Sequence, residues 1–378
     1  MWGYAPGNGP FQYPGPVLCV NQEDTVTVVL HNTLSEDVSI VFPGQADVLA
    51  DGAPSQPVYD DGNLLSLTKA AAPGGSVTYS FVASEPGTYL YHSGTDPDKQ
   101  VQMGLAGALV VRPGLGPDYA YDSADTRFNS DAEFLLVLSE IDPVMHQAVE
   151  QGQPFDMTQY HPRYWLINGR GFPDTLAPNY ASWLPDQPYS ALERIHPYDP
   201  VSNPLPMLTR YLSTGSFDYP FHPHGAHGRV IARDGRLLRG AGGEDLSYEK
   251  FTVTIGPGQT LDTLYTWGDT HAGLGYDIYG HAPGDPMQPG EYAPDHGKPL
   301  PVTIPQEQDQ TMGMYYSGSP FLGVMEPMLP GMMTYNQCGE NYLIAHSHAL
   351  HMIVAWDVLM SGMATYIRID PPLPNMCP

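Results

Sequence analysis

The sequence predicts an all-β protein made of two β-sandwich domains with long loop insertions. Glycine and proline each occur 40 times in 378 residues, and 25 tyrosines add to the strand-favouring valines and threonines. No stretch keeps an apolar period of 3.6 residues, whereas short apolar runs recur between glycine and proline turns. This punctuation is typical of sandwiches and barrels.

Two domains and a linker account for the chain. We expect a first domain over residues 1–113, a polar linker over 114–133 and a second domain over 134–378. Insertions rich in proline, glycine and tyrosine interrupt the second domain at 171–204 and 268–336. Loops of this length are usually functional or wrap another domain. Within the first domain we expect strands that include 17–20 and 38–42.

The chain is strongly acidic, with 15 basic against 41 acidic residues and a formal net charge of -26. Such a surface repels nucleic acid and anionic membranes, so we expect neither as a partner. It attracts metal ions and basic proteins, although an acidic surface also serves solubility alone. No apolar run is long enough to span a bilayer. The first residues do not form a signal peptide, so we expect a mature or trimmed chain.

The three cysteines form no metal or haem motif. Cys19 lies in an apolar run and is expected to be a buried free thiol. Cys338 and Cys377 flank the last two strands, and both a disulfide and two free thiols remain open. A disulfide would suit an oxidising compartment.

Two histidine pairs carry the functional prediction. His222 and His224, and then His346 and His348, are each separated by one residue at the end of a strand-like run. Because side chains alternate along a strand, each pair shares one face. Four imidazoles from two strand ends could hold one ion, or could be hydrogen-bonded relics that bind no metal.

Several segments form a recognisable series along the chain: Pro14-Gly15-Pro16-Val17, Gly87-Thr88-Tyr89-Leu90-Tyr91-His92, Trp165-Leu166-Ile167-Asn168-Gly169, Pro220-Phe221-His222-Pro223-His224-Gly225 and His346-Ser347-His348. Taken in this order, they resemble the multicopper oxidase family of laccases and their relatives. The resemblance implies two cupredoxin-like Greek-key domains, a cluster of three copper ions held by eight histidines, and a blue type 1 copper held by two histidines and a cysteine.

The resemblance also implies that copper ligands are missing. The first family motif falls at 41–44, where both histidines are absent, and at the second motif His92 remains while Gly94 replaces its partner. The type 1 positions hold Tyr219, Ser347 and Met352. A blue site needs a soft thiolate, which serine cannot supply. We therefore expect no type 1 copper and no ordinary laccase turnover.

The remaining candidate metal ligands are His222, His224, His346, His348 and His92. Imidazole suits copper and zinc, and affinity favours Cu(II). His227 and His351 lie just outside the pattern, as added ligands or as ordinary surface residues. Methionines in the second insertion are either soft ligands for Cu(I) or gap fillers.

Three functions remain open at this stage. The first is an extracytoplasmic copper-binding protein that stores or relays copper or catalyses slow redox chemistry. The second is an inactive scaffold for assembly at the cell surface or outside the cell, and the third is an oxidase that receives electrons from a partner protein. Two-domain members of the family form homotrimers, so the resemblance also implies a homo-oligomer.

Overall fold

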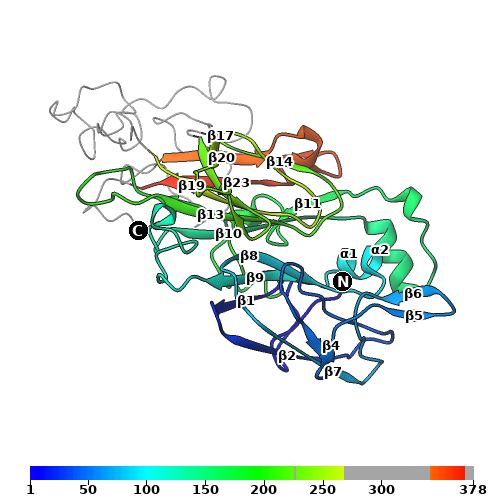
Figure 1. The fold of residues 1–378 in the computed structure, drawn as a ribbon. Helices are drawn as coiled ribbons and strands as arrows, with labels where there is room; N and C mark the ends of the chain where they lie inside the picture. The colour runs from blue at the N-terminus through cyan, green and yellow to red at the C-terminus, as the bar shows by residue number, and fades with distance from the viewer. Residues whose placement is uncertain (225–226, 268–340, 371–378) are drawn as a thin grey trace.

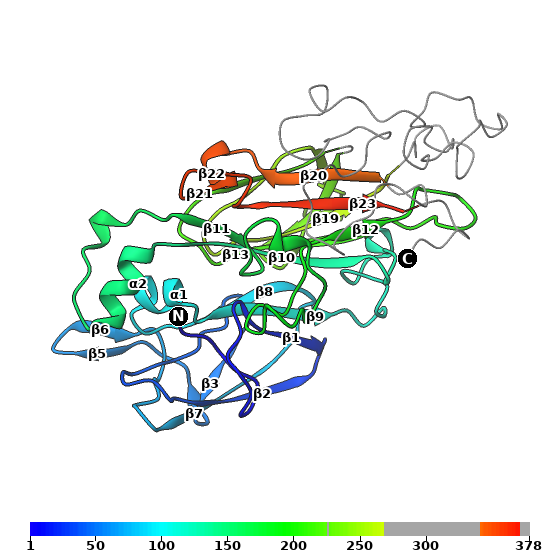
Figure 2. The same cartoon turned by 180° about the vertical axis from the view of Figure 1, so that it is seen from behind.

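The computed structural model describes residues 1–224, 227–267 and 341–370. Its regular structure is mostly β, which confirms the expected fold class. Four sheets form two sandwiches that stack on one another (Figure 1, Figure 2). The domain boundaries proposed from the sequence remain predictions.

The first sandwich pairs a four-stranded sheet with a three-stranded sheet. The four-stranded sheet has the order β2 (Thr25–His31), β7 (Ser76–Val82), β3 (Leu49–Ala50) and β4 (Ala53–Pro54). The three-stranded sheet has the order β1 (Gly15–Asn21), β9 (Ala106–Arg112) and β8 (Gly87–His92). Its accessory elements are the hairpin of β5 (Val58–Asp60) and β6 (Asn63–Ser66) and the helix α1 (Pro97–Met103).

The second sandwich pairs a seven-stranded sheet with a five-stranded sheet. The larger sheet has the order β11 (Tyr164–Ile167), β10 (Glu133–Ile141), β13 (Met207–Ser213), β19 (Thr260–Tyr265), β15 (Gly228–Arg233) and β16 (Arg236–Leu237), with β17 (Tyr248–Lys250) also paired to β15. The smaller sheet has the order β12 (Glu193–Ile195), β23 (Ala364–Ile369), β20 (Asn341–Ser347), β14 (Tyr219–Pro223) and β18 (Val253–Ile255). Accessory elements are α2 (Pro143–Glu150), the hairpin of β21 (Val354–Ala355) and β22 (Val358–Leu359), and 3-10 turns at Ala124–Thr126, Met157–Gln159, Asp174–Leu176 and Leu350–Ile353.

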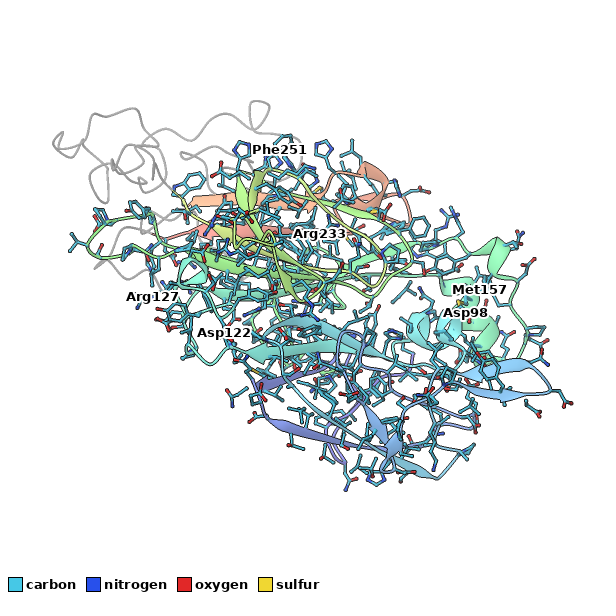
Figure 3. All side chains as sticks on the ribbon, in the orientation of Figure 1. Asp98, Asp122, Arg127, Met157, Arg233 and Phe251 are labelled. Atoms are coloured by element: carbon cyan, nitrogen blue, oxygen red, sulfur yellow. The ribbon has the colours of Figure 1, made fainter. Side chains whose placement is uncertain are left out.

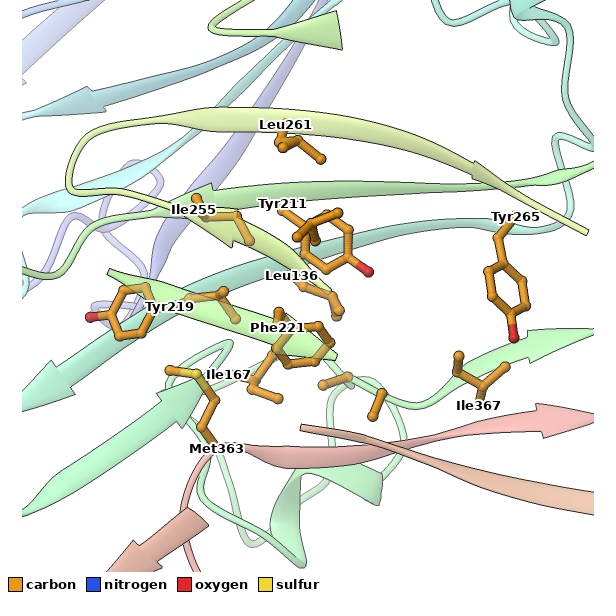
Figure 4. Close-up of a cluster of buried hydrophobic side chains, with 14 of the residues drawn as sticks. Leu136, Ile167, Tyr211, Tyr219, Phe221, Ile255, Leu261, Tyr265, Met363 and Ile367 are labelled. Atoms are coloured by element: carbon orange, nitrogen blue, oxygen red, sulfur yellow. The ribbon is translucent and has the colours of Figure 1, made fainter. Parts of the chain in front are cut away.

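Alternation of side chains builds each core. In β7, Val77, Tyr79 and Phe81 are buried while their neighbours are not, so one face of the strand packs into the first sandwich. The second sandwich has a larger core between its two sheets, shown in Figure 4, where Tyr211 and Phe221 are two of the buried rings. Apolar burial on this scale is the main favourable term in folding.

The two sandwiches meet where the three-stranded sheet faces the seven-stranded sheet (Figure 1). Apolar contact comes from the cluster of Leu90, Ala108, Val137 and Leu212.

A buried polar network crosses the same interface. Arg210, only 1% exposed, bonds Glu133 at 2.7 Å through Nε and Thr88 at 2.8 Å through Nη1. Thr88 in turn donates to Asp262 at 2.7 Å. Because Thr88 belongs to the first sandwich and its partners to the second, these bonds hold the domains in one relative position.

Two sequence expectations about the first domain are wrong. Cys19 is exposed, because β1 is the edge strand of its sheet and Cys19 lines a groove at the interface between the sandwiches. Residues 38–42 form no strand; Val38 and Val41 make only isolated bridges, to Ala71 and His92. In the described part of the chain no helix is long and apolar enough to cross a membrane. Cys338 and Cys377 lie outside the described residues.

Candidate metal centre

Neighbouring strands of the five-stranded sheet bring the two histidine pairs together. His222 of β14 lies directly opposite His346 of β20 in the antiparallel register. Since side chains alternate, His224 and His348 lie on the same face of the sheet as this pair. The intervening Phe221 points into the core, where it is fully buried. We call His222, His224, His346 and His348 the histidine cluster.

The four rings of the histidine cluster are in mutual contact. Ring centroids are separated by 4.6 Å for His222–His224, 5.0 Å for His222–His348, 5.3 Å for His224–His346, 5.6 Å for His222–His346 and 5.7 Å for His346–His348. The Nε2 atoms of His224 and His346 are 3.2 Å apart. Two nitrogens bound to one ion at about 2.0–2.1 Å lie roughly 3 Å apart, so this spacing suits a shared ion.

Hydrogen bonds at Nδ1 orient two of these rings. The His346 ring donates from Nδ1 to the Ser347 carbonyl at 2.8 Å. His222 donates from Nδ1 to the Phe251 carbonyl at 3.0 Å, with the Thr252 hydroxyl at 2.9 Å. A carbonyl only accepts, so both rings carry their proton on Nδ1 when neutral. Their Nε2 atoms therefore carry the lone pairs that could bind a metal, as in the usual support of histidine ligands, and the lone pair of His346 accepts from His224 Nε2 in this structure.

The cluster disfavours protonated histidine. Burial, followed by the neighbouring charges of His222, His346 and His348, lowers the pKa of His224 to about 4. Burial also lowers the pKa of His222 and of His346. These rings are therefore neutral at neutral pH, which is the state that binds metal.

The four imidazole rings of the histidine cluster lie close together, but their nitrogen atoms are not arranged around one point. Within residues 1–224, 227–267 and 341–370, no three His, Cys, Asp or Glu side chains meet the geometry of an assembled metal site. His346 is 8% exposed and His348 is exposed, so the cluster opens to the surface beside Phe251, which Figure 3 labels. Small ring rotations would be needed to direct all four nitrogens at one ion.

The fifth predicted ligand, His92, lies apart from the cluster. It ends β8 in the first sandwich, and the seven-stranded sheet separates that sheet from the one with the cluster (Figure 1, Figure 2). The His92 ring donates from Nδ1 to the Ser93 carbonyl at 2.8 Å, and burial lowers its pKa. His92 therefore makes the same Nδ1 hydrogen bond to the next residue's carbonyl as His346, but within one chain it is not brought to the cluster.

The position beside His92 has no room for a second histidine. A Cβ atom added at Gly94 would lie 2.8 Å from Val41 Cγ1 and 3.1 Å from both Leu67 Cβ and Ser39 Oγ. Backbone bonds between Val41 and His92 fix this approach. The glycine is required by local packing.

Tyr219, Ser347 and Met352 fill their own space on the core side of the sheet. They are 0%, 0% and 2% exposed, respectively. The Ser347 hydroxyl donates to the Met352 sulfur at 3.1 Å, and the Tyr219 hydroxyl donates to the Glu140 carboxylate. Sequence reasoning missed Glu140, although an acidic residue inside the apolar strand β10 was a signal that could have identified it.

The two extra histidines do not join the cluster. The His227 ring lies 5.7 Å from Phe251, which itself lies 5.5 Å from His222. His351 packs 5.2 Å from Trp165, at a different surface hollow. The methionine-rich segment lies outside the described residues.

Comparison with known proteins agrees with this architecture. Residues 8–115 match a family model described as multicopper oxidase. An L-ascorbate oxidase of Cucurbita maxima is 29% identical over 314 residues, covering 78% of this chain and 49% of the relative. An L-ascorbate oxidase of Cucumis sativus is 32% identical over 194 residues, covering 50% of this chain and 30% of the relative. The chain is therefore similar to multicopper oxidases, most directly over residues 8–115.

Solved structures extend the likeness to the fold of nearly the whole chain. A blue copper oxidase from Nitrosomonas europaea superimposes with a TM-score of 0.58 at 18% identity, over 95% of this chain and 77% of that one. The multicopper oxidase mgLAC gives a TM-score of 0.57 at 16% identity, with the same coverage of this chain and 77% of that one. The chain spans about half, or less, of the length of the curated relatives it matches.

Proposed function

We propose that this multicopper oxidase family protein binds about one or two copper ions through the histidine cluster and has no type 1 copper. The observation that carries the proposal is the 3.2 Å separation of the His224 and His346 Nε2 atoms, with neutral rings on one face of one sheet. When bound, copper would exchange single electrons. The chain would supply oriented neutral imidazoles, and ordinary laccase turnover is not expected.

Copper is favoured over zinc by the donor set. Four imidazoles suit either ion, but the affinity order of divalent metals places Cu(II) above Zn(II). His92 would complete the set only if a second copy of the chain presented it. A homo-oligomer, and a trimer in particular, is therefore part of the proposal, together with an extracytoplasmic location.

Metal analysis tests this proposal directly. Protein loaded with Cu(II) and dialysed should retain copper, and the double variant His346→Ala, His348→Ala should lose it. His31→Ala is the matched control, because His31 is exposed on β2 and bonds only Ser76 among the contacts described. Unchanged copper content in the double variant would refute the proposal, and zinc loading in parallel tests metal preference.

An inactive scaffold is the second candidate. It is supported by the closed packing of Tyr219, Ser347 and Met352 and by the apolar surface of the β5–β6 hairpin, where Tyr59 and Leu64 are exposed. A metal that binds only the folded chain must raise its melting temperature. A scaffold without metal should therefore melt at the same temperature with copper and with a chelator.

An oxidase supplied with electrons by a partner protein is the third candidate. It requires oxygen consumption driven by a reduced protein donor, and the loss of that consumption in His346→Ala. Copper binding without such consumption would leave storage or relay of copper as the function.

A further inference from the structure

A buried carboxylate joins two tyrosines below the histidine cluster. Glu140 is 1% exposed and accepts bonds from the Tyr160 hydroxyl at 2.6 Å, from the Ser216 backbone N–H at 2.8 Å and from the Tyr219 hydroxyl. Three hydrogen-bonding groups thus converge on this carboxyl, and Oε1 must be an acceptor because the backbone N–H of Ser216 can only donate. Burial raises the pKa of Glu140, which makes this carboxylate a stronger base than one in water.

We propose that Tyr219 is a redox-active tyrosine with Glu140 as its proton acceptor. A strong one-electron oxidant gains one electron and the Tyr219 phenol loses it. The phenolic O–H bond breaks as an O–H bond forms at Glu140 Oε2, leaving a neutral phenoxyl radical and a neutral carboxylic acid. A one-electron donor reverses both changes. This step does not depend on copper binding.

The proton transfer needs little rearrangement. Donor and acceptor are already hydrogen-bonded, and a positioned base is what lets a proton leave as the reaction occurs. Gly215 packs against both groups, because a Cβ added there would overlap the Tyr219 hydroxyl and Glu140 Oε2. On the other side Tyr160 accepts a bond from Gln102, which also contacts His146 at 3.0 Å. Tyr219 and Glu140 are therefore held in place by Gly215 on one side and by Tyr160 on the other.

Aromatic rings connect this pair to the surface. The Tyr160 ring stacks on Phe217 at 6.2 Å, and Phe217 meets Trp165 edge-on at 5.3 Å. Trp165 lines a surface hollow of about 350 Å³ together with Trp356, which is 53% exposed. An external oxidant placed in this hollow would be linked to Tyr160 by aromatic rings in contact. Tyr160 is in turn linked to Tyr219 through Glu140.

Strand β14 connects the same tyrosine to the histidine cluster. Tyr219 precedes His222 by three residues, which corresponds to about 10 Å along a strand. The tyrosine thus occupies the position at which the family resemblance places a type 1 copper ligand. A one-electron site at this position would give the chain an electron carrier made of protein alone.

Two of the other buried tyrosines, Tyr121 and Tyr79, lack the combination of a hydrogen-bonded hydroxyl and a carboxylate without a neighbouring cation. Tyr121 donates to Asp262 at 2.6 Å, but the Arg210 guanidinium lies 3.5 Å from the same Asp262 oxygen and would repel the proton that this oxygen must accept, a cation that Glu140 does not have beside it among the contacts described. Tyr79 is fully buried and donates to the Lys69 carbonyl at 2.6 Å, which is a weak base. They are the matched controls.

Freeze-quenched paramagnetic resonance tests the assignment. The full chain is oxidised with photogenerated tris(bipyridine)ruthenium(III) and frozen. The wild type should show a neutral tyrosyl signal, Tyr219→Phe should lose it, and Glu140→Gln should lose most of it because an amide cannot take the proton. Tyr79→Phe and Tyr121→Phe should retain it.

Several results would overturn the proposal. They are no tyrosyl signal in the wild type, an undiminished signal in Tyr219→Phe, and loss of the signal in Tyr79→Phe or Tyr121→Phe. An undiminished signal in Glu140→Gln would overturn the role of the carboxylate. If a variant fails to fold, the wild type in D2O decides, since a coupled proton transfer must slow there and an unchanged rate would contradict it.

Discussion

The Ser347 hydroxyl donates a hydrogen bond to the Met352 sulfur at 3.1 Å on the core side of strand β20. The bond satisfies the buried Ser347 hydroxyl within the core. The buried Tyr219 hydroxyl is likewise satisfied, by its hydrogen bond to the Glu140 carboxylate. Tyr219, Ser347 and Met352 are therefore held by packing and hydrogen bonding. The absence of a cysteine is not the only feature that distinguishes these positions from a type 1 copper site.

Restoring the cysteine alone should not restore a blue copper. In Ser347→Cys we expect no intense blue absorption after copper loading, because the buried Tyr219 and Met352 stand where the family resemblance implies the two histidine ligands. Visible absorption and paramagnetic resonance check this. The triple variant with Tyr219→His and Met352→His is the comparison. A blue band in the single variant would show that the other two positions do not exclude copper.

The buried carboxyl of Glu193 should make stability fall as pH rises. Burial raises its pKa from 4.5 to about 7, one oxygen accepts from Thr209 at 2.5 Å, and the other is buried without a partner among the residues that the structure describes. The folded chain then holds this proton to higher pH than the unfolded chain. Its contribution to the free energy of unfolding is present below about pH 4.5 and declines by about 3 kcal/mol as pH rises through 7.

Urea unfolding at pH 5 and pH 8 measures this effect. Glu193→Gln should be more stable relative to wild type at pH 8 than at pH 5, since the amide carries no charge at either pH. Glu249→Gln on the exposed strand β17 is the control and should show no such difference. Parallel pH profiles for wild type and Glu193→Gln would contradict the prediction.

A side chain at position 94 should destabilise the first sandwich. The Cβ of Gly94→Ala would approach Val41 Cγ1 to 2.8 Å, so we expect a loss of about 1–3 kcal/mol in the free energy of unfolding. Val41→Ala in the same chain should recover part of the loss. Gly114→Ala, whose Cβ meets nothing closer than Gln22 Oε1 at 3.3 Å, is the control. Equal stability of the two alanine variants would rule out crowding at Gly94.

The buried arginine at the domain interface should matter far more than an exposed one. Arg210→Leu leaves Glu133 and Asp262 without their shared cation, and breaking a buried pair costs about 3–5 kcal/mol. Arg127→Leu removes an ion pair to Asp118 at 2.8 Å that is largely exposed, so we expect a loss of about 0–1 kcal/mol. Denaturant unfolding of both variants measures the difference, and equal losses would contradict it.

Local patterns in the sequence predicted which histidines share a strand face, while their role as metal ligands stays a prediction. The spacing of His222 and His224, and of His346 and His348, placed each pair on one face because alternation is a local property of strands. That β14 pairs with β20 is a contact between residues more than a hundred positions apart, and no local signal specifies it.

Other features depended on neighbours that the sequence does not reveal. Cys19 was expected to be buried from its apolar surroundings, but an edge strand exposes it. Glu140 in β10 was overlooked because its partners Tyr160 and Tyr219 come from later segments of the chain. Long-range pairing, and not residue type, decided these cases.

The register of β14 against β20 has a consequence for how such a chain can change in evolution. Single substitutions at His222 or His346 remove one imidazole and leave the core untouched. A one-residue deletion within β14 would instead turn the downstream histidine toward the core and a core side chain toward solvent. A point substitution can therefore add or remove a ligand without disturbing the core, whereas a small insertion or deletion in these strands would disturb both.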